Sequence, residues 1–141
     1  MEIKNKGIVL MALIAALFTF SACTTFSNHT ESDEEILEKR VKQSMAARVN
    51  NQWGEVYDFF APEYRKNVSK AEFAKTSRNI QIPSYHIESI EILPSGKEAV
   101  AKIKYSTIFR GVEFSDNLMS QKWIKKNGKW FLKMKPKDKE N

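Results

Sequence analysis

Two side chains in the sequence, His86 and Tyr105, are of types that could move a proton near neutral pH. A histidine titrates near pH ~6.5 and can act as a general base, and a tyrosine hydroxyl can donate to a developing oxyanion. The two residues lie on stretches of alternating hydrophobicity joined by the turn signal at 94–97. A symmetric turn there would set His86 opposite Tyr105 on antiparallel strands. General-base chemistry is therefore one hypothesis for this pair.

A structural contact is the simpler interpretation of the same pair. No aspartate falls on the buried face of a predicted strand, because Asp116 is expected in a loop and Asp58 on the polar side of a helix. The sequence has no nucleophile elbow, Walker motif or dinucleotide-binding glycine pattern. One cysteine and two histidines exclude an intramolecular disulfide and leave too few ligands for a cysteine- or histidine-rich metal centre. We expect no cofactor, no metal and no catalytic residue.

The first 22 residues have the pattern of a targeting segment. Two lysines precede an apolar run at 7–20, which is shorter than the ~20 residues of a membrane-spanning helix and typical of a secretory signal. The four residues that end at Cys23, F-S-A-C, resemble the bacterial lipobox. This resemblance implies that Cys23 carries a diacylglyceryl thioether after cleavage, so that the protein is exported and lipid-anchored in the cell membrane or outer membrane. An ordinary signal peptide with a chance cysteine is the alternative.

The remaining sequence divides into a tether, one domain and a tail. Residues 23–32 have no apolar period and are expected to form a tether that keeps the domain close to the bilayer. Residues 33–136 are predicted to be one α+β domain, and 137–141 a charged tail. The chain carries a net charge of +6, with lysines concentrated toward its end. Because the protein is predicted to be exported, anionic lipid or wall polymers fit this charge better than nucleic acid, and a solvated surface is the simpler alternative.

Helical patterns occupy the first half of the predicted domain. A capping box begins at Ser32, and apolar residues recur every four positions to about Asn50, with Arg48 assigned to a polar face. A second helical face ends before Pro62, and a second capping box begins at Ser69. The residues of the second face are Trp53, Val56, Tyr57 and Phe60.

The second half of the domain alternates with a period of two, which predicts strands. Asn127-Gly128 is a strong signal for a type I′ hairpin and sets Trp123 opposite Leu132. The apolar face of the second strand is expected to continue through Thr107 and Phe109. We predict an antiparallel sheet with helices on its apolar face. The predicted strands are 85–93, 98–110, 118–126 and 129–134.

Together these elements resemble the nuclear transport factor 2-like domains. The resemblance rests on the stretch from Trp53 to Arg65 and on the hairpin from Trp123 to Trp130, and it covers Asp33 to Lys135. It implies N-terminal helices packed on a curved four-stranded antiparallel sheet that forms a cone around an apolar pocket. The candidate pocket residues are Tyr57, His86, Glu88, Tyr105, Thr107, Gln121 and Trp123.

We therefore expect a membrane-anchored cell-envelope lipoprotein whose domain binds an apolar small molecule or a partner protein without catalysis. The alternative that the resemblance implies is a cofactor-free isomerase or hydratase, with His86 as the base and Tyr105 as the oxyanion donor. A homodimer formed through the open face of the sheet is a third expectation.

Overall fold

Helix α1 runs from Asp33 to Val49 in the computed structural model, which describes residues 30–134. The hydroxyl of Ser32 accepts a hydrogen bond from the backbone N–H of Glu35 at 3.2 Å, and Glu35 Oε2 accepts from the backbone N–H of Ser32 at 2.7 Å. The predicted capping box is therefore confirmed. The helix buries one stripe of side chains, which consists of Leu37, Val41, Ser44, Met45 and Ala47.

The predictions for the signal segment 1–22, the lipid site Cys23 and the tail 137–141 lie outside the described residues. Among the helices of 30–134, none has both the length and the apolar character that crossing a membrane requires.

Three short helices follow α1 in the described part of the chain, one more than the sequence predicted. Helix α2 (Trp53–Asp58) buries the predicted apolar face, and α4 (Lys70–Ser77) begins after Ser69, whose hydroxyl accepts from the backbone N–H of Glu72 at 3.2 Å. Between them, α3 (Pro62–Asn67) occupies a stretch for which the sequence predicted no helix. Pro62 lies in the first turn of α3, where a missing N–H leaves no helical hydrogen bond unmade. The proline therefore begins a helix as well as separating it from α2.

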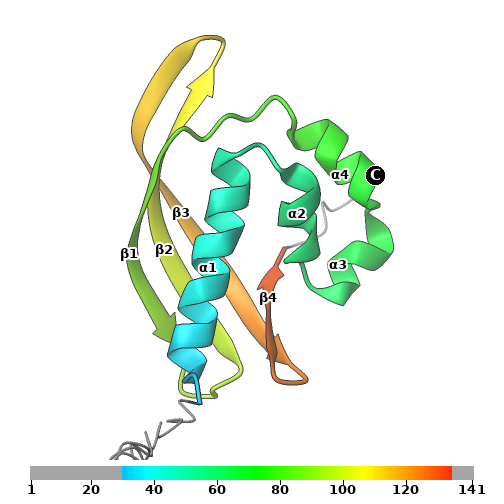
Figure 1. Ribbon diagram of the computed structural model, residues 1–141, viewed down its shortest axis with the longest axis vertical. Helices are drawn as coiled ribbons and strands as arrows, with labels where there is room; N and C mark the ends of the chain where they lie inside the picture. The colour runs from blue at the N-terminus through cyan, green and yellow to red at the C-terminus, as the bar shows by residue number, and fades with distance from the viewer. Residues whose placement is uncertain (1–29, 135–141) are drawn as a thin grey trace, which may run out of the picture. The chain divides into compact units, whose positions relative to one another are not determined.

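Within residues 30–134, four antiparallel strands form one sheet in the order β1-β2-β3-β4. Figure 1 shows α1 across one face of this sheet and the three short helices grouped on the side of β4. β1 and β4 remain as two separate edges, so the four strands form one open sheet. The strands are β1 (Tyr85–Ile92), β2 (Glu98–Phe109), β3 (Val112–Lys126) and β4 (Lys129–Lys133).

The β3–β4 hairpin has the predicted register. Trp123 pairs with Leu132, and the turn residues Asn127 and Gly128 have φ values of 49° and 75°. The β2–β3 hairpin is longer than predicted because Arg110 and Gly111 also adopt positive φ, at 51° and 80°. Such a pair supports a two-residue turn, but arginine is not a residue that signals one.

The register between β1 and β2 follows the prediction near the turn and differs from it farther along the two strands. Near the turn, Ile90 pairs with Ala101 as a symmetric loop requires, but an irregularity between Ile87 and Ser89 shifts the rest by one residue. His86 consequently pairs with Lys104, so the predicted pair with Tyr105 is wrong. The cause is the spacing of Ile87 and Ile90, which lie three apart and both pack against the core. Strict alternation would place them on opposite faces, and a bulged residue between them restores a common face.

A second irregularity lies between β2 and β3. Tyr105 pairs with Asn117 and Thr107 with Phe114, so two residues of β3 oppose one residue of β2. Asp116, which we expected in a loop, lies inside β3 at this bulge with a φ of 59°. Beyond the bulge the faces exchange, and Phe109 is 60% exposed. The prediction that the apolar face continues through Phe109 is therefore wrong.

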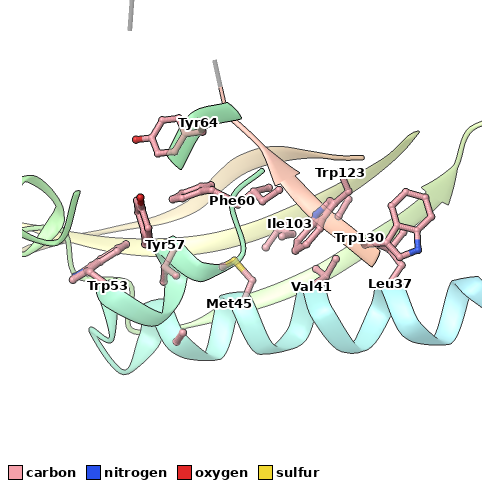
Figure 2. Close-up of a cluster of buried hydrophobic side chains, with 14 of the residues drawn as sticks. Leu37, Val41, Met45, Trp53, Tyr57, Phe60, Tyr64, Ile103, Trp123 and Trp130 are labelled. Carbon is pink, nitrogen blue, oxygen red and sulfur yellow. The ribbon is translucent and has the colours of Figure 1, made fainter. Parts of the chain in front are cut away.

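The core lies between α1, the short helices and the inner face of the sheet. Figure 2 shows Val41 and Met45 of α1 near Ile103 of the sheet, with Phe60 above them. Phe60 is fully buried and packs against Tyr64 and Phe73, with ring centroids 4.7 and 4.9 Å away. This aromatic cluster connects the short helices to one another and to the sheet.

Candidate functional site

A cavity of about 570 Å³ lies between the short helices and the inner face of the sheet. Its volume falls in the range of small-molecule sites. Ile80 and Met134 line it while remaining 45% and 42% exposed, which places them at its mouth. The other apolar lining residues are Trp53, Phe60, Phe73, Ile82, Met119 and Leu132.

The cavity exists because β4 is much shorter than β3. β4 ends at Lys133, which pairs with Lys122, so within residues 30–134 the part of β3 before Lys122 has no partner strand on that side. Met119, Ser120 and Gln121 of this uncovered part form one wall. The C-terminal end of α1 and the helices α2 and α4 provide the opposite side.

Arg48 is the arginine in the wall of this cavity. It lies in the last turn of α1, where a cation interacts favourably with the helix dipole. Within the described part of the chain its guanidinium has no hydrogen bond or ion pair, and its Nε is buried without a partner. Burial disfavours the charged form and lowers the pKa of Arg48 to about 10, an effect that Tyr105 opposes. Arg48 therefore stays protonated at neutral pH in a largely apolar site.

Gln121 supplies a second polar group to the same wall. Its side chain is 4% exposed, and its Oε1 accepts a hydrogen bond from Trp123 Nε1 at 3.2 Å. Its Nε2 faces the sulfur atoms of Met45 and Met119 at 3.2 and 3.5 Å. Because a thioether is a weak acceptor, this amide retains capacity to donate to a bound polar group.

The structure brings only two of the predicted pocket residues to this cavity, Tyr105 and Gln121. Tyr57 is buried, and its hydroxyl donates to the carbonyls of Val68 at 2.8 Å and Arg65 at 3.2 Å. It therefore connects α2 to the C-terminal end of α3. Trp123 is fully buried in the core.

The other predicted residues lie elsewhere on the sheet. His86 is exposed and borders a second, polar hollow of about 410 Å³ together with Tyr105 and Asp116. Glu88 forms an ion pair with Lys104 at 2.9 Å, which raises the pKa of that lysine. Thr107 is half-buried and borders neither space. The predicted general-base pair is thus not assembled across β1 and β2.

Sequence reasoning missed Arg48 although a signal for it was present. We assigned Arg48 to a polar face, yet it follows Met45 by three positions and Val41 by seven. That spacing continues the buried stripe of α1. We interpreted Arg48 as solvated because it is charged, whereas the helical period predicts its position correctly.

Comparisons with known proteins support the fold alone. No protein-family model matches the chain, and no curated protein matches it. A solved structure with a similar backbone is that of a SEC-C motif containing protein from Rhodopseudomonas palustris. The similarity has a TM-score of 0.55, covers 73% of this chain and 76% of that chain, and comes with 14% sequence identity. The class that the fold defines is therefore an α+β domain with helices on a four-stranded antiparallel sheet.

Proposed function

We propose that this domain binds an apolar small molecule in the cavity behind β4. The observation that carries the proposal is the cavity itself, whose wall is largely aromatic and aliphatic and whose mouth keeps Ile80 and Met134 half-exposed. When a bound ligand removes apolar side chains from contact with water, the free energy of the system falls, which favours binding. The few polar groups in the wall can orient such a ligand.

We also propose that the protein is a non-catalytic lipoprotein of the cell envelope, anchored through Cys23. The support is the apolar run at 7–20 followed by F-S-A-C at Cys23. A relationship to the nuclear transport factor 2-like domains belongs to the same proposal. Its support is the order of the elements, helices followed by an antiparallel meander that ends in a tryptophan-rich hairpin.

Filling the cavity tests the binding proposal. Ser77 lines the cavity at the end of α4, so Ser77→Phe is expected to occupy part of the ligand volume. The measurement is the rise in Tm that 1-decanol causes, with the full chain held in phospholipid nanodiscs. A ligand at about a hundred times its Kd stabilises by ~2.7 kcal/mol. We therefore expect a rise of several degrees for the wild type and little or none for the variant.

Two further variants make this result specific. Lys75→Phe adds the same ring at an exposed position of α4 and should respond to decanol like the wild type. Ile80→Trp narrows the half-exposed mouth with less risk to folding and should reduce the response. Decanol that fails to stabilise the wild type, or that stabilises Ser77→Phe equally, would rule out binding at this cavity.

A further inference from the structure

The charged groups that border the cavity are all cations. Arg48, Lys122 and Lys133 line it, and none of its described lining residues is an aspartate or glutamate. Lys122 and Lys133 face each other directly across β3 and β4, an arrangement that is destabilising for like charges. Lys133 reaches Glu98 at 3.4 Å on the exposed surface, whereas Lys122 has no ion pair among residues 30–134. The mouth therefore attracts anions.

Arg48 extends this positive character into the apolar interior. A guanidinium taken out of water without a counter-charge is costly, and a bound anion would remove that cost. Among residues 30–134, Arg40 and Arg65 also have a buried Nε without a partner. However, neither borders the cavity, and Arg40 lies over the ring of Phe59 with its Cζ 4.9 Å from the centroid. Of these three arginines, Arg48 is the one that lines the cavity.

We propose that the ligand is an aliphatic carboxylate, with its head group against Arg48 and its chain against the apolar wall. This inference rests on the proposed binding function and specifies the chemistry of the ligand. A carboxylate matches the planar fork of a guanidinium with two parallel hydrogen bonds. Tyr105 and Gln121 border the same space and can donate hydrogen bonds to a carboxylate oxygen.

The apolar part of the wall favours a flexible chain over a rigid ring system. Met119 and Met134 have unbranched side chains that adapt to a ligand, and Ile80, Ile82 and Leu132 complete an aliphatic side of the cavity. The residues at the mouth are both apolar and cationic.

The experiment compares two ligands that differ only in the head group. Decanoate and 1-decanol are titrated by calorimetry into the full chain in phospholipid nanodiscs, and titration into empty nanodiscs is subtracted. We expect decanoate to bind the wild type at least tenfold more tightly than decanol. In Arg48→Gln, decanoate should lose about 10–100-fold in affinity, because one charge-assisted interaction is removed, while decanol should keep its affinity.

Further variants keep this test decisive. Lys42→Gln removes an exposed charge of the same helix and should leave both affinities unchanged. Lys122→Gln should weaken decanoate by only about two- to threefold and only at low salt, as an exposed charge does. Because Lys122 is exposed, Lys122→Gln is expected to fold even if Arg48→Gln does not.

The possible results separate the two proposals. Equal affinities of decanoate and decanol for the wild type would overturn the carboxylate assignment and leave apolar binding intact. Tighter binding of decyl phosphate than of decanoate would overturn the carboxylate assignment as well. Failure of both decanoate and decanol to bind would overturn the proposed binding function itself.

Discussion

Replacing Trp130 with alanine is expected to lower the free energy of unfolding by about 3–5 kcal/mol. Trp130 is fully buried on the inner face of β4, and its Nε1 has no partner within residues 30–134. The substitution therefore removes apolar contacts and leaves a void without breaking a side-chain hydrogen bond. A loss of this size is a large part of the stability of a small domain. Urea denaturation of wild type and variant measures it.

Lys129 provides the matched control for this prediction. It precedes Trp130 in β4, its side chain is exposed, and Lys129→Ala should change the free energy of unfolding by no more than about 0.5 kcal/mol. Because adjacent residues of a strand point to opposite faces, the two variants report the register of β4 directly. Equal urea midpoints for the two variants would contradict the register shown by the β3–β4 hairpin.

Local signals in the sequence were sufficient for most of the secondary structure. Ser32 and Ser69 cap the helices that follow them, and Asn127-Gly128 forms the predicted turn. In each case the structure depends only on residues that are neighbours in the sequence, so a local pattern is enough to predict it. α3 was missed because the proline that ends one helical pattern is also a favourable first residue for the next.

The candidate site was less predictable because a single bulge changes which residues meet. The isoleucines at 87 and 90 break strict alternation, and this spacing could have predicted the bulge in β1. Once the bulge is present, His86 lies beside Lys104 and not beside Tyr105. A register deduced from the turn alone holds only as far as the first irregularity.

The cavity, and the position of Arg48 in its wall, depend on where several helices and strands end. β4 stops at Lys133, α1 ends just after Arg48, and α4 ends at Ser77. The sequence indicates these ends to within a few residues, but a cavity requires that they meet at one place. The helical period could place Arg48 on the buried face, whereas the absence of an acidic partner for it among residues 30–134 is a property of the assembled wall.

The largest effect outside the folded domain is expected for the lipid anchor. Cys23→Ser removes the thiol that the lipobox resemblance designates for lipidation, so the signal should remain uncut or the chain should become soluble. Two acyl chains hold a protein on a membrane durably, because each buried methylene contributes ~0.8 kcal/mol, whereas no such attachment exists in the variant. Membrane fractionation and the intact mass measure this result, and Thr24→Ala, beside the same site, should be lipidated like the wild type. A Cys23→Ser chain that is processed and sediments with membranes as the wild type does would contradict the anchor and leave an ordinary secretory signal as the explanation of residues 1–22.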